Sequence, residues 1–195
     1  MDKPLSELDV LLVDDNAHNN YLLTEILQSL GVRSVTKASD GISGYEILCT
    51  RNIDLVICDW KMKPVDGVKF SQRVRRSPDS PCPCVPIIML TGHADIERVV
   101  EARDAGCNDF LAKPVSPATL LARITAILET PREFVRTLDY FGPDRRRRDG
   151  VREGEDRRQP PPVTVSVAGA TTALQPRSPA NAKKKNNRTI PKNKA

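Results

Sequence analysis

Short apolar segments alternate with segments of helical periodicity through the first 130 residues. The apolar segments are rich in Val, Ile and Leu and end abruptly, which is typical of strands buried on both faces. Between them, apolar positions recur every three or four residues, as on one face of a helix. The predicted strands are 8–13, 32–38, 53–58, 87–90 and 108–112. The predicted helices are 17–30, 41–48, 67–76, 94–105 and 117–129.

Strand–helix alternation of this kind predicts an α/β fold. Consecutive parallel strands are joined by right-handed crossovers, which put helices on both faces of one sheet. We therefore expect a doubly wound, five-stranded parallel sheet, with the βα unit repeated five times, in residues 1–130. A domain of about 125 residues buries a core large enough to fold without metal ions or disulfides.

The alternation ends after Pro131. Residues 131–141 contain one short cluster of apolar and aromatic side chains, which we interpret as an extension of the domain. Residues 142–195 contain runs of arginine, proline and lysine, and too little apolar surface to offset the entropy of ordering the chain. We predict a disordered basic tail there, with at most a weak strand over 163–167.

Charge divides the chain at the same place. Residues 1–130 carry 14 Lys and Arg against 18 Asp and Glu, whereas residues 131–195 carry 16 against 7. No segment reaches the ~18 apolar residues of a membrane span, and the first residues lack the pattern of a secretory signal. We expect a cytoplasmic protein with no membrane partner, whose five cysteines are reduced thiols.

Polar side chains that suit a chemical site follow the predicted strands. Asp14 and Asp15 follow the first strand, Asp59 the third, Thr91 the fourth and Lys113 the fifth. In open α/β sheets, sites form at the carboxyl ends of the strands, which lie ~4.8 Å from their neighbours. A single aspartate there is more often a helix N-cap. Three converging carboxylates repel one another and favour Mg²⁺, while a lysine and a hydroxyl suit an incoming anion.

These residues lie in segments that resemble the receiver domain of two-component response regulators, of the stand-alone kind related to chemotaxis regulators. The matching segments are 13–16, 57–67, 87–93 and 105–114, within residues 8–130. The resemblance implies a flavodoxin-like fold. It also implies a phospho-acceptor with slow self-catalysed phosphoryl transfer and hydrolysis, rather than an enzyme.

The resemblance implies a role for each residue of the acidic site. Asp59 would be the phospho-acceptor. Asp14, Asp15, Asp59 and the backbone carbonyl of Lys61 would hold Mg²⁺, and Lys113 would pair with the phosphoryl oxygens. A carboxylate nucleophile that forms an acyl phosphate, with cations to neutralise the transferring group, is consistent with these roles.

The resemblance also implies a conformational switch. Thr91 would be the switch hydroxyl and Phe110 the aromatic side chain that turns inward on activation. The Lys113–Pro114 bond would be cis, which costs little only before proline. One departure concerns the loop after the acceptor, where Lys63 occupies the position that is commonly proline. This departure leaves the metal ligands unchanged.

The expected function is a bacterial phosphorylation switch. It would receive a phosphoryl group from a histidine kinase or phosphotransfer protein and signal by binding a downstream protein. An alternative of another class stays open, in which the Arg/Lys-rich tail binds nucleic acid under control of the receiver. The segment Tyr140–Arg148 ends in four arginines. The sequence leaves open whether it is a solvated linker, docks on the receiver's acidic surface, or contacts an acidic partner or nucleic acid.

Overall fold

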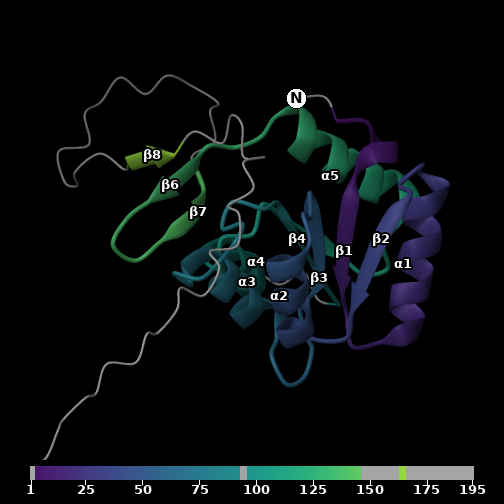
Figure 1. Ribbon diagram of the computed structural model, residues 1–195, viewed down its shortest axis with the longest axis horizontal. Coiled ribbons are helices and arrows are strands. Elements are labelled where there is room, and N and C mark those ends of the chain that lie inside the picture. Colours follow the sequence, from purple (N-terminus) through teal and green to yellow (C-terminus); the bar gives the residue numbers. More distant parts are fainter. Residues whose placement is uncertain (1–2, 93–95, 146–162, 166–195) are drawn as a thin grey trace, which may run out of the picture.

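A parallel sheet of five strands forms the centre of the domain, with the strand order β2-β1-β3-β4-β5 (Figure 1). The computed structural model describes residues 3–92, 96–145 and 163–165. A 3-10 turn, η1 (Leu5–Glu7), precedes the sheet. The strands are β1 (Asp9–Val13), β2 (Ser34–Ala38), β3 (Leu55–Asp59), β4 (Ile87–Thr91) and β5 (Asp109–Ala112). The helices are α1 (Ala17–Ser29), α2 (Gly41–Thr50), α3 (Gly67–Arg76), α4 (Ile96–Asp104) and α5 (Pro117–Glu129).

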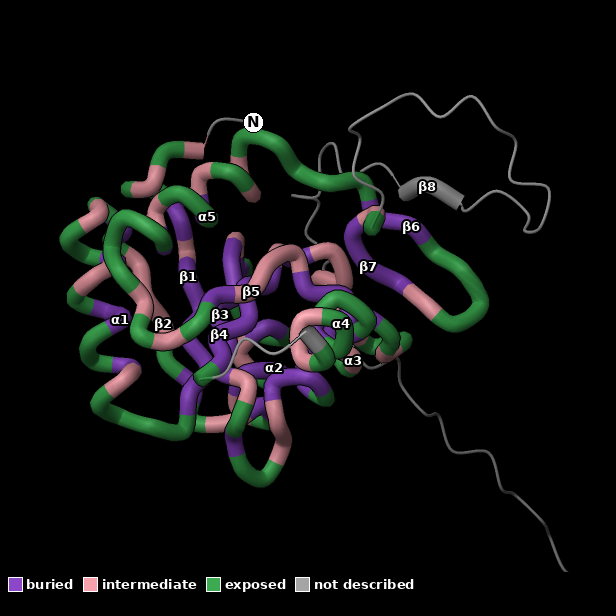
Figure 2. The backbone as a smooth tube through the Cα atoms, turned by 180° about the vertical axis from the view of Figure 1, so that it is seen from behind, coloured by how far each residue is buried: buried purple, intermediate pink, exposed green. Residues whose placement is uncertain are grey.

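Helices cover both faces of this sheet, so its inner strands β1, β3 and β4 are buried along most of their length, whereas the edge strands β2 and β5 are only partly buried (Figure 2). Successive side chains of a strand point to opposite faces. Leu11 and Val13 of β1 therefore join the cluster under α2, α3 and α4, while Val10 and Leu12 join the cluster under α1 and α5. The predicted doubly wound fold is confirmed. Among the described residues, no helix is long and apolar enough to cross a membrane.

The second strand begins later than the sequence pattern predicts, at Ser34 instead of Val32. The end of α1 accounts for the difference. Gly31 has a φ of 95°, its N–H donates to the carbonyl of Gln28, and the N–H of Val32 donates to the carbonyl of Leu27. Val32 thus belongs to the C-terminal cap of α1, and β2 begins only after this residue.

A second, antiparallel sheet follows α5. It contains β6 (Phe134–Arg136), β7 (Phe141–Pro143) and β8 (Val163–Val165), with β6 in the middle. Both views place the β6–β7 hairpin beside α3 and α4, outside the parallel sheet (Figures 1 and 2).

The sequence pattern predicts no strands in residues 131–141 and a tail that begins at residue 142. That boundary is wrong by a few residues, because β7 continues through Gly142 and Pro143, which are buried. The strand expected over 163–167 covers Val163–Val165. The other residues of the predicted tail after 145 lie outside the described residues, and so does most of the basic segment that the nucleic-acid alternative requires.

A buried arginine connects this hairpin to the domain. The side chain of Arg75, in the last turn of α3, is 2% exposed, and burial lowers its pKa to about 10. Its guanidinium donates to the carbonyls of Gly106 (2.9 Å) and Pro83 (2.8 Å) and to the side chain of Asn108 (3.2 Å). The same group lies 5.1 Å from the ring centroid of Phe134 in β6. Arg75 therefore links α3, the loop after it, the α4–β5 turn and the hairpin.

The α4–β5 turn approaches the hairpin too closely for a larger residue. Gly106 has a φ of 86°, which disfavours residues with a Cβ. A Cβ there would also lie 2.9 Å from the Phe141 carbonyl oxygen and 2.9 Å from Cγ of Arg75. Gly142 in β7 is restricted by the same close approach, since a Cβ added there would lie 2.8 Å from Cα of Gly106. Two glycines thus allow the hairpin backbone to pack against the turn.

This packing predicts different costs for two truncations within the hairpin. Phe134 is 2% exposed and Leu138, in the turn between the strands, is fully exposed. Phe134→Ala should lower the free energy of unfolding by about 3 kcal/mol, because it leaves a cavity beside Arg75. Leu138→Ala, the matched control, should change it by less than about 0.5 kcal/mol. Urea unfolding measures both, and equal stability of the two variants would show that the hairpin is not docked.

Candidate functional site at the carboxyl ends of the strands

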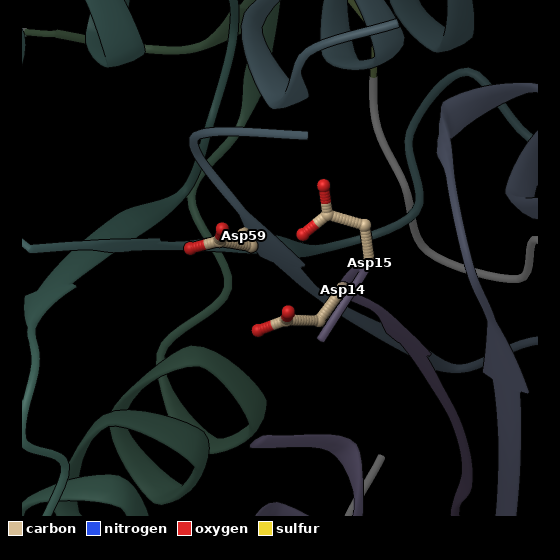
Figure 3. A group of neighbouring side chains, drawn as sticks. All are labelled: Asp14, Asp15 and Asp59. Atoms are coloured by element: carbon tan, nitrogen blue, oxygen red, sulfur yellow. The ribbon is translucent and has the colours of Figure 1, made fainter. Parts of the chain in front are cut away.

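Three carboxylates meet where β1 and β3 end (Figure 3). Asp14 and Asp15 follow β1, Asp59 is the last residue of β3, and one oxygen from each lies within 4.8 Å of the others. Asp14 and Asp59 are buried at 2% and 8% exposure, whereas Asp15 is exposed to solvent. Three close oxygen donors, two buried and one open to water, fit a Mg²⁺ ion, which keeps several of its water ligands.

Lys113 lies between the two buried carboxylates. Its Nζ is 2.9 Å from Oδ2 of Asp14 and 2.8 Å from Oδ1 of Asp59. The residue directly follows β5, and its N–H donates to the carbonyl of Thr91 across the edge of the sheet (2.7 Å). The Lys113–Pro114 bond is cis, as the resemblance implied, and Lys63–Pro64 is also cis. The sequence therefore identified the four charged residues that the fold brings together.

Burial and charge act on this cluster in opposite directions. Burial raises the pKa of Asp59, although the hydrogen bond and charge of Lys113 lower it, and the charge of Asp14 raises it further. Burial alone would lower the pKa of Lys113, but its hydrogen bonds to Asp14 and Asp59 and their charges prevail and raise it. The ammonium of Lys113 is thus held in its charged form.

Amide groups in and just before the first turn of α1 fix Asp14, and they are absent from the residues that we predicted for the site. The N–H of Asn16 donates to the Asp14 carboxylate (2.8 Å), and so does the side-chain amide of Asn19 (3.2 Å). The amide of Asn20 donates to the Asp14 carbonyl (2.7 Å). The sequence contains a signal for these contacts, because three asparagines lie within six residues after Asp14. Their amide groups can reach the end of the strand from the first turn of the helix that follows.

The loop after Asp59 folds back tightly over this residue. The N–H of Gly67 donates to the carbonyl of Trp60 (3.0 Å), and Asp66 caps α3 by accepting from the N–H of Lys69 (2.8 Å). A Cβ on Gly67 would lie only 2.2 Å from the Asp59 carbonyl oxygen. The backbone of α3 can therefore begin directly above Asp59 only with glycine at this position.

The predicted switch residues lie on neighbouring strands. Thr91 is the last residue of β4 and is 2% exposed. In the sheet register it follows Leu90, which is paired with Asp59, so Thr91 lies at the same edge of the sheet as Asp59. Phe110 lies on β5, half-buried against the cluster under α2, α3 and α4. Lys61 is exposed in the loop after β3, and the metal-binding role of its carbonyl stays a prediction.

Comparison with known proteins agrees with this geometry. The family model described as "Response regulator receiver domain" matches residues 10–125. "Probable chemotaxis protein CheY" of Rhizobium etli is 36% identical over 121 residues, which are 62% of this chain and 92% of that protein. "Chemotaxis protein CheY-3" of Vibrio cholerae is 30% identical over 122 residues, 63% of this chain and 92% of that protein.

Solved structures agree as well. Chemotaxis protein CheY4 of Vibrio cholerae is 30% identical with a TM-score of 0.57, covering 62% of this chain and 98% of that one. A CheY-like receiver domain protein of Methanospirillum hungatei is 27% identical with a TM-score of 0.56, covering 63% and 95%. The family match ends before the β6–β7 hairpin, which follows α5. In fold, in the acidic cluster and in sequence, this chain belongs to the receiver domain family of two-component response regulators.

Proposed function

We propose that this receiver is a cytoplasmic response regulator that is activated when Asp59 accepts a phosphoryl group from a histidine kinase or phosphotransfer protein. The phosphorylated chain then signals by binding another protein. The contact that supports this proposal most directly is Lys113, whose ammonium lies within 3 Å of both buried carboxylates. This arrangement leaves Asp59 charged, partly desolvated and beside a fixed cation, which suits a nucleophile that attacks a phosphoryl group.

In the transfer step, an oxygen of Asp59 forms a bond to phosphorus while the bond from phosphorus to the donor's histidine nitrogen breaks. The imidazole leaves and takes up a proton from solvent. When bound by Asp14, Asp15, Asp59 and the carbonyl of Lys61, Mg²⁺ supplies charge that neutralises the phosphoryl oxygens. Lys113 supplies a second positive charge that is already in place, and such preorganised charge is the main requirement of phosphoryl transfer. Water can later attack the phosphorus of the acyl phosphate, which slowly releases inorganic phosphate and restores the Asp59 carboxylate.

The switch then follows from the new negative charge. The phosphoryl group attracts Lys113 and the hydroxyl of Thr91, which lies at the same edge of the sheet. Movement of Thr91 opens space into which Phe110, on the adjacent strand, turns from its half-buried position. A local change of charge thereby shifts an element with two stable positions and alters the surface over α4 and β5.

An apolar groove beside the acidic cluster is the surface that we propose for the phosphoryl donor. The groove has a volume of about 520 Å³ and lies between α1 and the β5–α5 loop. Its walls include Leu22, Ile26 and Val115, and Lys113 lies at its edge. A donor histidine must reach Asp59, so the donor's surface has to cover the area around Lys113. The exposed side chain of Leu22 and its apolar neighbours suit a helical surface of the donor.

The first test of this function concerns the acceptor. Asp59→Asn should abolish labelling by acetyl phosphate in the presence of Mg²⁺, because an amide cannot act as the nucleophile. Asp79→Asn, in an exposed loop after α3, is the control and should be labelled like the wild type. Intact-mass spectrometry detects the added phosphoryl group, and circular dichroism checks the fold. Full labelling of Asp59→Asn would refute the assignment.

The second test concerns the metal. Asp15→Asn should weaken Mg²⁺ affinity at least about ten-fold, since a hard cation loses a charged oxygen ligand. The same variant should unfold at an equal or higher temperature without metal, because repulsion in the cluster is reduced. The fluorescence of Trp60, the single tryptophan of the chain and adjacent to Asp59, can follow the titration. A Mg²⁺ titration that matches the wild type would remove Asp15 from the site.

The third test concerns the donor surface. Purified histidine kinases from the same genome can be screened for transfer of radioactive phosphate to the full chain. At least one should label the wild type, and Leu22→Asp should slow that transfer about ten-fold or more, since a charge would be buried in an apolar contact. Labelling by acetyl phosphate should be unchanged in this variant. If Leu22→Asp slows both donors equally, the groove is not a docking surface for the kinase.

A further inference from the structure

The β6–β7 hairpin creates a groove that is separate from the phosphorylation site. The groove has a volume of about 590 Å³ and lies between the hairpin and the end of α3 with the loop that follows it. The groove lies near the end of α4 and the start of β5. Asp59 and Lys113 lie at the opposite edge of the sheet, where the strands end. Because the family match ends at residue 125, one wall of this groove lies outside the matched domain.

The hairpin that forms this wall is held in place by several contacts. Arg145, just after β7, lies 2.9 Å from a carboxylate oxygen of Asp104 at the end of α4. The hydroxyl of Tyr140 donates to the carbonyl of Pro143 (2.8 Å). Together with the hydrogen bonds of Arg75, which lines the groove, and the packing of Gly142 on the α4–β5 turn, these contacts give the groove a fixed shape. The aromatic start of the Tyr140–Arg148 segment is therefore structural.

Positive charge dominates this groove. Three arginines line it (Arg75, Arg76 and Arg136), and among its described lining residues Asp139 is the only acid. Arg75 is engaged internally by Gly106, Pro83 and Asn108, so the exposed guanidiniums of Arg76 and Arg136 are the groups that can meet a ligand. Arg76 is oriented by a hydrogen bond to the carbonyl of Asp139 (2.8 Å).

Both exposed guanidiniums are preorganised for carboxylates. Arg136 lies over the ring of Phe141, 4.6 Å from its centroid, which restrains the side chain. A restrained guanidinium binds a carboxylate through two parallel hydrogen bonds at a smaller entropic cost than a flexible lysine would. Leu138, fully exposed in the hairpin turn, adds an apolar contact at the edge. The surface thus combines two carboxylate receptors with a leucine.

A nucleotide or single-stranded nucleic acid fits this groove less well. Such ligands are bound through stacking of bases on free aromatic faces as well as through phosphate contacts. Here Arg136 covers Phe141, and Arg145 covers Tyr140 at 3.7 Å from its ring centroid. Phe134 is buried against Arg75. Each of these three aromatic side chains packs against an arginine, so none presents a free face on which a base could stack.

From this arrangement we infer a second binding site, in which the groove between α3 and the β6–β7 hairpin binds an acidic, leucine-containing segment of a partner protein. Arg76 and Arg136 bind two of its carboxylates, and Leu138 contacts its apolar side chain. The site does not include Asp59 or its neighbours. It therefore gives the chain an attachment point that is independent of phosphoryl transfer and stands whether or not the proposed function is correct.

Binding of a defined peptide to the full chain tests this inference. The probe is a fluorescein-labelled peptide with the repeat Asp-Glu-Leu-Glu, followed by fluorescence anisotropy at physiological salt, where distant charges are screened beyond about 8 Å. Arg136→Gln and Arg76→Gln should each weaken binding about five- to ten-fold, the effect of losing one charge-assisted contact. Arg136→Lys should bind the peptide more tightly than Arg136→Gln but more weakly than the wild type. Arg33→Gln removes the same charge from an exposed site after α1 and should stay within about two-fold of wild type.

Further measurements separate the groove from general attraction to the basic tail. In nuclear magnetic resonance titrations, the peptide should shift the amides of Ser77, Ser80 and Leu138, which line the groove. Equal losses in Arg136→Gln and Arg33→Gln, or shifts confined to residues after 145, would overturn the proposal. So would tighter binding of an oligo-dT probe that depends on Arg76 and Arg136, since that would make the groove a nucleic-acid site. Urea unfolding of each variant checks that the hairpin remains docked.

Discussion

Repulsion among three carboxylates at one edge of the sheet is the constraint on which the site depends. The nearest oxygens of the three carboxylates lie within 4.8 Å of one another. At this distance two unit charges repel by about 3 kcal/mol at an effective dielectric constant of ~20, and at shorter distances they repel more strongly. Lys113 offsets part of this repulsion through its contacts with both Asp14 and Asp59. The remaining negative charge favours a divalent cation.

The rest of the domain holds these charges in register. Parallel pairing of β1, β3, β4 and β5 brings their carboxyl ends to one edge, and apolar clusters on both faces fix the sheet. Amides in and just before the first turn of α1 orient Asp14, and the absence of a side chain at Gly67 lets α3 start above Asp59. Each of these features keeps like charges near one another, which is unfavourable for the isolated domain.

The hairpin after α5 extends this fold at the other side of the sheet. It contacts the end of α4 through Asp104 and the α4–β5 turn through Gly106. The segment from Thr91 to Phe110, which contains α4, therefore has the acidic site at one end and the hairpin near the other. A partner that binds the hairpin groove would lie close to the elements that the proposed switch moves, while leaving the acceptor accessible to its donor.

The sequence by itself determined the parallel fold and the charged residues of the site. Local periodicity identified each strand and helix of the sheet, and the topology of parallel strands then required Asp14, Asp59 and Lys113 to share one edge. The sequence could not determine contacts between residues that are far apart in the chain, because such contacts leave no periodic pattern in the sequence. Arginines in the last turn of α3 suit any helix C-terminus, where positive charge is favourable. Only the tertiary structure decided that Arg75 is buried, because its partners Gly106 and Phe134 come from the α4–β5 turn and from β6, while its neighbour Arg76 faces the groove.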